Sequence, residues 1–280
     1  MKKNKLVAPV LKWVGGKRQL LDTLKPMIPQ KITTYCEPFV GGGAMLFNIQ
    51  PNVAYINDIN SDLMLVYNII KSDVEALIST LSTYKNDSEF FYTIRDWDRN
   101  KEKFASLTNI ERAARTIYLN KTCFNGLYRV NNAGEFNSPF GSYKNPNIVN
   151  APVLRAVSSY FNNADITFTS IDYEEILNSI PRGTFVYLDP PYDPISETSN
   201  FTGYAKGGFT REDQIRLRKC CDKLTKRNIK FMLSNSSTEF IHELYKDKAY
   251  NITIIQAKRN INSVASKRGD VDEVVVRNYE

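Results

Sequence analysis

Histidine is nearly absent from this sequence, since His242 is the single one among 280 residues. It lies in STEFIHELYK, a stretch with helical spacing, where a packed or solvated histidine is the ordinary role. A metal site needs partners of suitable type and spacing, and the sequence around His242 offers none. We therefore expect no bound metal, and catalytic triads built on histidine lose their main candidate.

Cysteine is also scarce and follows no metal or redox pattern. The chain contains Cys36, Cys123, Cys220 and Cys221, and no pair has the CxxC spacing. Neither a zinc knuckle nor a redox motif is supported, and a reducing cytoplasm fits best.

Long apolar segments are missing as well, because no run approaches the roughly 20 residues that a membrane span needs. The N-terminal stretch MKKNKLVAPVLKW starts basic but lacks the apolar core of a signal peptide. We therefore expect a cytoplasmic protein with no membrane partner. The 37 Lys and Arg against 30 Asp and Glu give a net charge of +7, which suits an anionic partner such as nucleic acid.

A glycine-rich loop is the first pattern that points to a ligand. In TTYCEPFVGGGAMLF, a β-rich run at 33–36 leads to three glycines at 41–43. The next apolar run ends at Asp58, which follows Glu37 by about 20 positions, near the spacing between a nucleotide-binding loop and the acid that accepts ribose hydroxyls. The full GxGxxG pattern is missing, so a nucleoside without a diphosphate fits better. A turn with no ligand would use the same glycines and remains the alternative.

The second pattern is DPPY at 189–192, behind the apolar run TFVYL at 184–188. A β-branched, aromatic and aliphatic run of this kind predicts a strand buried on both faces, as in a parallel sheet. Asp189 then stands at the carboxyl end of the strand, where open α/β sheets bind ligands. Each proline fixes φ and removes a backbone donor, so Asp189, the Pro190 carbonyl and Tyr192 form a rigid array. A stiff turn without a ligand is the alternative.

Such an array suits the exocyclic amine of a nucleobase. That nitrogen attacks poorly because its lone pair is delocalised into the ring. Asp189 and the Pro190 carbonyl can accept its two hydrogens while Tyr192 stacks on the ring. A base reaches such a pocket only when it is flipped from the duplex, at a cost of a few kcal/mol.

The region at 62–150 differs from its flanks and is predicted to be an insertion. IERAARTIYLN has helical spacing, whereas FNGLYRVNNAGEFNSPFG alternates apolar and polar residues around Asn132 to Gly134, as a hairpin does. Strand and helix patterns then alternate to the late strand IKFMLSN, with a capping box predicted at Thr210 and Asp213. The fold class is therefore α/β with a parallel or mixed sheet.

Taken together, the motifs resemble the Dam-type family of adenine-specific DNA methyltransferases. They are LKWVGGKRQLL, EPFVGGG, INDINSDL, FNGLYRVN, GEFNSPFGSYKNP, YLDPPYDPISETSNFTGY and LSNSS, in the order of that family. The resemblance implies a Rossmann-like, S-adenosylmethionine-dependent methyltransferase sheet with an inserted helical and β-hairpin target-recognition domain. It assigns 1–61 and 151–280 to a catalytic, cofactor-binding domain and 62–150 to DNA target recognition.

The reaction implied is methyl transfer from S-adenosylmethionine to the 6-amino group of adenine in double-stranded DNA, within GATC, by base flipping. A prokaryotic or phage-encoded protein is implied too. The catalytic residues are Asp189, Pro190 and Tyr192. The implied cofactor residues are Trp13, Lys17, Glu37, Phe39, Gly41, Gly43, Asp58 and Asp189. The implied DNA contacts are Lys12, Phe124, Asn125, Leu127, Arg129, Asn131, Asn137, Pro139 and Tyr143.

Several alternatives remain open at this point. The family often has Tyr where this chain has Phe124, so stacking is expected there without a hydroxyl contact. An RNA or cytosine-amino methyltransferase can use similar tetrapeptides, and a catalytically inactive DNA-binding regulator can share the scaffold. A carbon-directed cytosine enzyme is disfavoured because none of the cysteines follows a proline. The sequence leaves the biological role and the oligomeric state open.

Overall fold

The computed structural model describes residues 3–13, 15–195, 208–258 and 270–280. One stretch named above lies outside these residues. It is 196–204, the later part of the motif that contains DPPY.

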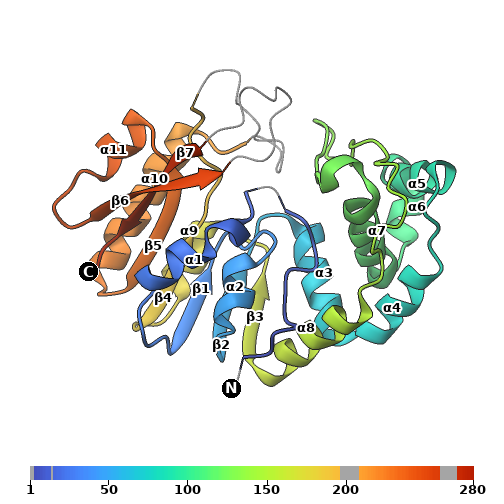
Figure 1. Ribbon diagram of the computed structural model, residues 1–280, viewed down its shortest axis with the longest axis horizontal. Coiled ribbons are helices and arrows are strands. Elements are labelled where there is room, and N and C mark those ends of the chain that lie inside the picture. The colour runs from blue at the N-terminus through green and yellow to red at the C-terminus, as the bar shows by residue number, and fades with distance from the viewer. Residues whose placement is uncertain (1–2, 14, 196–207, 259–269) are drawn as a thin grey trace.

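In the described part of the chain, one sheet contains seven strands in the order β3-β2-β1-β4-β5-β7-β6 (Figure 1). Strands β1 to β5 run parallel, whereas β7 pairs antiparallel with β5 and with β6. The predicted Rossmann-like α/β sheet is therefore confirmed. The bounds are β1 Thr34–Glu37, β2 Val53–Asn57, β3 Asp165–Thr169, β4 Thr184–Leu188, β5 Lys230–Ser236, β6 Asn251–Lys258 and β7 Asp270–Arg277.

Strand β4 shows why a continuous apolar run forms a central strand. All five of its residues are buried, as the sequence predicts. Phe185 and Tyr187 face one hydrophobic core, and Val186 and Leu188 face a second core on the other side of the sheet. Because successive side chains of a strand point to opposite faces, a strand covered on both faces has no polar side to expose.

The helices cover both faces of this sheet and extend beyond one edge. Figure 1 shows α4, α5, α6 and α7 grouped beyond the β3 edge, with α9, α10 and α11 toward the other side. None of the helices in the described ranges is both long and apolar enough to cross a bilayer. The α-helices are α1 Leu21–Leu24, α2 Ala44–Ile49, α3 Ser61–Ser72, α4 Val74–Ser82, α5 Ser88–Arg95, α6 Lys101–Ser106, α7 Asn109–Thr122, α8 Ala151–Asn163, α9 Tyr173–Ser179, α10 Arg211–Lys226 and α11 Glu239–Tyr245. The 3₁₀ helices are η1 Lys17–Gln19, η2 Lys25–Met27, η3 Asp96–Arg99 and η4 Phe124–Gly126.

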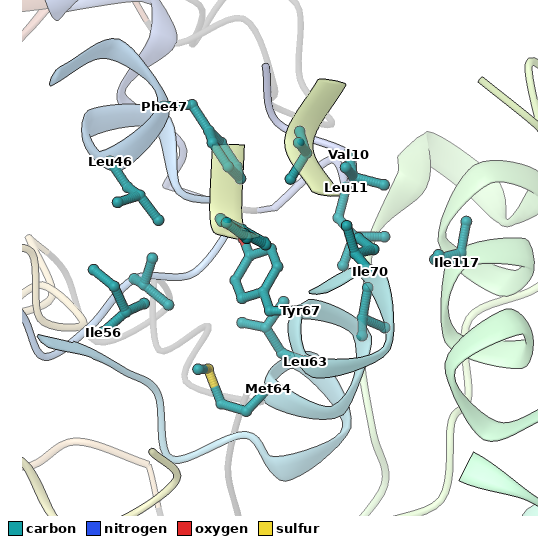
Figure 2. Packing of buried hydrophobic residues seen from close by; sticks show 14 of the residues in the cluster. Val10, Leu11, Leu46, Phe47, Ile56, Leu63, Met64, Tyr67, Ile70 and Ile117 are labelled. Carbon is teal, nitrogen blue, oxygen red and sulfur yellow. The ribbon is translucent and has the colours of Figure 1, made fainter. Parts of the chain in front are cut away.

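Helix α3 connects the sheet to the remaining helices of the insertion. Its Tyr67 ring lies 6.1 Å from the ring of Phe47 and 6.0 Å from those of Phe161 and Phe168. Figure 2 shows the same hydrophobic cluster continuing to Ile117 of α7. The division into 1–61 with 151–280 and 62–150 stays a prediction, and α3, at the start of the second part, contacts both β3 and α7.

Several local predictions can be compared with the structure directly. Helix α10 begins with the predicted capping box, in which Thr210 and Asp213 each accept from the backbone N–H of the other. The single histidine, His242, is half-buried, and its Nε2 lies 2.9 Å from the Ser237 hydroxyl. All four cysteines are buried and form no disulfide.

The predicted hairpin is present as a short antiparallel arrangement. Val130 and Phe136 form an isolated bridge, and Asn131 N–H donates to the Glu135 carbonyl at 2.9 Å. The Asn131 side chain closes the turn, since its amide oxygen accepts from the backbone N–H groups of Ala133 and Glu135. This turn fixes the position of the segment that carries the predicted DNA contacts.

Gly43, which precedes α2, gives a test of this local packing. Its backbone has φ +71°, and a Cβ there would lie 2.8 Å from Cε2 of Phe47. We expect Gly43→Ala to lower the free energy of unfolding by about 2 to 4 kcal/mol, because left-handed strain and a steric clash add. Urea denaturation measures the change.

The matched control is Gly183→Ala, where φ is +81° and a Cβ would meet nothing within 4 Å. This variant carries the backbone strain alone, so its loss should be about 1 to 2 kcal/mol. Equal losses in the two variants would contradict the packing argument.

Candidate active site

The two sequence patterns meet at one place in the sheet. Strand β1 leads outward through β2 to β3, whereas β4 lies on the opposite side of β1 and leads to β5. The strand order therefore reverses between β1 and β4, and open α/β sheets bind ligands outside the carboxyl ends of the strands at such a point. Glu37 ends β1 and Asp189 directly follows β4, so both predicted acids lie at this crevice.

Asp58 holds the glycine loop in place. Its Oδ2 accepts from the Gly41 N–H at 2.9 Å, and its Oδ1 accepts from the Asn60 N–H at 3.0 Å. The Tyr67 hydroxyl donates to the Gly41 carbonyl at 2.7 Å. Burial raises the pKa of Asp58 to about 6, and the two backbone N–H groups oppose that rise. A carboxylate oxygen has two lone pairs, so each can still accept from a ligand.

Glu37 lies deeper than Asp58. It is 2% exposed, and its Oε2 accepts from the Tyr35 hydroxyl at 2.8 Å. Burial raises the pKa of Glu37 well above its ordinary range, and the charges of Asp189 and Asp58 add to the rise. Glu37 therefore lies beneath the crevice, where it is already hydrogen-bonded within the protein.

Trp13 covers the glycine loop from outside. A Cβ on Gly41 would lie 2.8 Å from Cδ1 of Trp13, and a Cβ on Gly42 would lie 3.1 Å from its Cβ. The indole also stacks on Tyr128, with 5.0 Å between ring centroids and an interplanar angle of 26°. The sequence pattern relates these glycines to a ligand. The close contact with Trp13 is a second reason for glycine at 41 and 42.

Lys17 links the N-terminal segment to the tetrapeptide. Its Nζ lies 2.8 Å from Oδ1 of Asp189, and the two side chains are 6% and 17% exposed. The ammonium also donates to the Gly15 carbonyl at 2.7 Å and lies 4.6 Å from the centroid of the Tyr192 ring. The approach to Oδ1 is an ion pair without regular hydrogen-bond angles, which leaves that oxygen able to accept from a donor with better geometry.

The ionisation of Asp189 reflects opposing effects. Burial raises its pKa to about 6, and the charge of Glu273 adds to the rise. The Lys17 ammonium lowers the pKa through its charge and contact, and the Tyr192 hydroxyl lowers it further. Asp189 is therefore mostly ionised at neutral pH, and it acts as a hydrogen-bond acceptor in that form.

A buried polar network fixes the loop after β4. The Pro191 carbonyl accepts from Gln214 Nε2 at 2.9 Å, and the Asp193 N–H donates to Asn235 Oδ1 at 3.1 Å. Asn235 in turn donates to Gln214 at 3.1 Å, and the Ser236 hydroxyl donates to the Asp193 carbonyl at 2.6 Å. No sequence motif predicts this network, although LSNSS is a signal for it, because it places polar residues at the end of an apolar strand.

Two further residues near the crevice were also missed. Ile59 directly follows Asp58 and is 60% exposed, so it offers an apolar surface beside this acid. Glu273 of β7 accepts from the Tyr192 hydroxyl at 2.7 Å. Phe39, which was predicted, packs on Tyr173 with 5.2 Å between ring centroids.

The N-terminal segment and the insertion share a second contact beside the crevice. Lys12 N–H donates to Asn120 Oδ1 at 2.9 Å, and Asn120 Nδ2 donates to the carbonyls of Lys12 and Gly126. This brings Lys12 next to η4, where Phe124 is 55% exposed and Asn125 has φ +58°. Lys12, Phe124 and Asn125, three of the predicted DNA contacts, are therefore neighbours.

The other predicted DNA contacts lie on the hairpin and the loop after it. Arg129 Nε donates to Asn137 Oδ1 at 2.7 Å, which orients the guanidinium. The Pro139 carbonyl accepts from the Phe124 N–H at 2.8 Å, and Tyr143 is 39% exposed. Leu127 is half-buried. Because the Asn131 side chain is engaged in the turn, its amide is less available to DNA than the others.

Comparison with known families decides the class of this protein. Residues 13–261 match the family described as D12 class N6 adenine-specific DNA methyltransferase. The chain belongs to this family. It is a site-specific DNA methyltransferase that acts on adenine, so the predicted family and enzyme class are confirmed.

Individual relatives of this methyltransferase agree along its whole length. The Type II methyltransferase M1.LlaDCHI of Lactococcus lactis subsp. cremoris is 44% identical, over 100% of this chain and 98% of the relative. The Type II methyltransferase M.MjaIII of Methanocaldococcus jannaschii is 44% identical, over 98% of this chain and 99% of the relative. The DNA adenine methylase of Escherichia coli strain K12 is 35% identical, over 98% of this chain and 95% of the relative.

The Lys17–Asp189 pair of this methyltransferase gives a test of the electrostatics. Lys17→Met removes the main group that lowers the pKa of Asp189, so we expect that pKa to rise above about 6. Carboxyl ¹³C NMR against pH, assigned with Asp189→Asn, measures the midpoint. The control is Lys12→Met, which removes a lysine that does not pair with Asp189. An unchanged midpoint in Lys17→Met would refute the assignment.

Proposed function

We propose that this methyltransferase uses S-adenosylmethionine to methylate the 6-amino group of adenine in double-stranded DNA, within GATC, after flipping the base into the crevice at Asp189 to Tyr192. The observation that carries the proposal is the position of Asp189. It stands at the reversal point of the sheet, between the glycine loop held by Asp58 and the ring of Tyr192.

The residues around the glycine loop fit such a cofactor. S-adenosylmethionine combines a ribose diol, an adenine ring, an amino acid group and a positive sulfonium. Asp58 has acceptor lone pairs for the diol, and the exposed Ile59 offers an apolar face to the adenine ring. Lys17 can pair with the carboxylate of the cofactor, while the remaining predicted residues shape the pocket. Those are Trp13, Glu37, Phe39, Gly41 and Gly43.

At the target, the protein has to prepare a weak nucleophile. The bound cofactor supplies an electrophilic methyl group, and the amine nitrogen of adenine needs help to attack it. Asp189 is mostly ionised at neutral pH and accepts one amine hydrogen. The Pro190 carbonyl accepts the other, since none of the described residues donates a hydrogen bond to it. Tyr192 stacks on the base and holds its ring near the methyl donor.

Recognition of the sequence is assigned to the part at 62–150 together with Lys12. Phe124 is exposed and aromatic, so it can enter the base stack where the adenine leaves. Arg129, oriented by Asn137, suits the bidentate contact to a guanine edge. GATC is the site that the family resemblance implies, and the relative named DNA adenine methylase supports it. Bacterial, archaeal and phage relatives support a cytoplasmic enzyme that is prokaryotic or phage-encoded, as part of the same proposal.

Labelled methyl transfer tests the reaction. A GATC duplex and methyl-labelled S-adenosylmethionine should give label in adenine after digestion to nucleosides, and Asp189→Ala should lower kcat by at least about 10³-fold, because the main acceptor at the amine is lost. The control is Asp165→Ala, which removes an exposed acid at the opposite end of the sheet and should leave the rate unchanged. Label in cytosine, or in RNA but not DNA, would overturn the proposal.

Arg129 tests the recognition role. We expect Arg129→Ala to lower the preference for GATC over single-base variants by about 1 to 3 kcal/mol at one position, because a bidentate guanine contact is lost. The ratio of kcat/KM values across a panel of duplexes measures this. The control is Arg155→Ala, which removes an exposed arginine of α8 that pairs with Glu75 of α4. It should leave that ratio unchanged. A uniform loss on every duplex would assign Arg129 to phosphate contacts instead.

A further inference from the structure

The strand β7 brings an acid to the target pocket that no sequence motif indicates. Strands β4 and β5 end at the crevice, but β7 is antiparallel to them, so its beginning lies at that same edge. Glu273 lies near this beginning, opposite Ser236 of β5 and Ile255 of β6. From there its Oε2 reaches the Tyr192 hydroxyl at 2.7 Å.

We propose that Glu273 is a positioning residue for methyl transfer, which holds the Tyr192 ring against the flipped adenine and sets the charge around Asp189. The inference rests on the proposed stacking role of Tyr192. It assigns to Glu273 no contact with the base or with the methyl donor, since its carboxylate acts through the tyrosine hydroxyl and through its field.

The geometry explains how one hydrogen bond can orient an aromatic ring. The hydroxyl of tyrosine lies on the long axis of the ring, so fixing it sets the tilt of the ring about χ1. A charge-assisted hydrogen bond of 2.7 Å is a strong restraint. The ammonium of Lys17 lies 4.6 Å from the ring centroid and restricts the ring from one face. Tyr192 is therefore held at its tip by Glu273 and along one face by Lys17.

The residues before and after Tyr192 are held as well, so the Glu273 contact acts on the side chain of Tyr192 and not on its backbone. Gln214 binds the Pro191 carbonyl, and Asn235 binds the Asp193 N–H. The backbone on both sides of Tyr192 is thus fixed by α10 and β5. Loss of the Glu273 contact should release the ring without releasing the loop.

The charge of Glu273 acts on Asp189 separately from this hydrogen bond. The charged and titratable groups around Asp189 are Lys17 of η1, Glu273 of β7, Glu37 of β1, Tyr187 of β4 and Tyr192 of the loop. Lys17 lowers the pKa of Asp189, whereas Glu273 raises it. Removing only the charge of Glu273 should therefore lower that pKa, so that Asp189 stays ionised to a lower pH.

Two substitutions separate the two effects. Glu273→Gln keeps an oxygen that can accept from Tyr192 but loses the charge. Glu273→Ala loses both. We expect Glu273→Ala to lower kcat by roughly 10- to 100-fold, as the loss of one hydrogen bond to a charged group implies. Glu273→Gln should recover most of that rate, and the acidic limb of its pH profile should move to lower pH.

The experiment uses the full chain with a GATC duplex and S-adenosylmethionine. Single-turnover rates from pH 5 to 8 give the acidic limb, and titration of the cofactor alone gives its affinity as a check on folding. The cofactor affinity should stay within about twofold of the wild type in both variants, because Glu273 acts on the target side. Asp272→Ala is the matched control, since the neighbouring side chain on β7 is exposed, and it should change neither quantity.

A mutant cycle with Tyr192→Phe makes the inference decisive. This substitution keeps the ring and removes the hydroxyl, so its loss should resemble that of Glu273→Ala, and the double variant should be no worse than either. Additive losses, or an unchanged pH profile in Glu273→Gln, would overturn the role of Glu273. A separate outcome bears on the proposed reaction itself. Full activity in both Tyr192→Ala and Asp189→Ala would show that methyl transfer does not occur at this crevice.

Discussion

The ion pair between Lys17 and Asp189 joins parts of the chain that are far apart in sequence. Lys17 follows the segment that covers the glycine loop, and Asp189 directly follows β4, all five residues of which are buried. With both groups shielded from water, their attraction is strong enough to offset part of the desolvation that burial imposes on Asp189. The same contact places the ammonium beside Tyr192. The N-terminal segment beside the glycine loop and the tetrapeptide loop after β4 are therefore joined by a single charge pair.

Around this pair, the fold uses buried hydrogen bonds to hold irregular backbone. Asp58 and Tyr67 support the glycine loop, and Asn235 with Gln214 supports the loop after β4. Loops at the edge of a sheet have no strand partners, so their polar groups must be satisfied by side chains. Asp58 directly follows β2 and Tyr67 lies within α3, whereas Asn235 belongs to β5 and Gln214 to α10. The backbone on both sides of the crevice is thereby held by hydrogen bonds within the protein.

Much of this arrangement could be predicted from local sequence. Apolar runs identify β1, β2, β4 and β5, and a capping box marks the start of α10, because those signals depend on near neighbours. Glu273 could not be predicted, since its partner Tyr192 lies 81 positions away. The stacking of Trp13 on Tyr128 was missed for the same reason. Asn131 was read as a DNA contact, whereas its side chain also closes the hairpin turn, a use that depends on the fold of its own loop.

The acids of the crevice link ligand binding to folding. Asp58 and Asp189 each have a pKa of about 6 in the folded chain against 3.8 as the ordinary value. Between these values the native state binds more protons than the unfolded state, so native stability declines as the pH rises through that interval. At neutral pH both carboxyl groups are mostly ionised, so the cost of burying their charges lowers the stability of the native state. A cationic ligand beside the two carboxylates offsets this cost, so binding such a ligand at neutral pH should raise the free energy of unfolding.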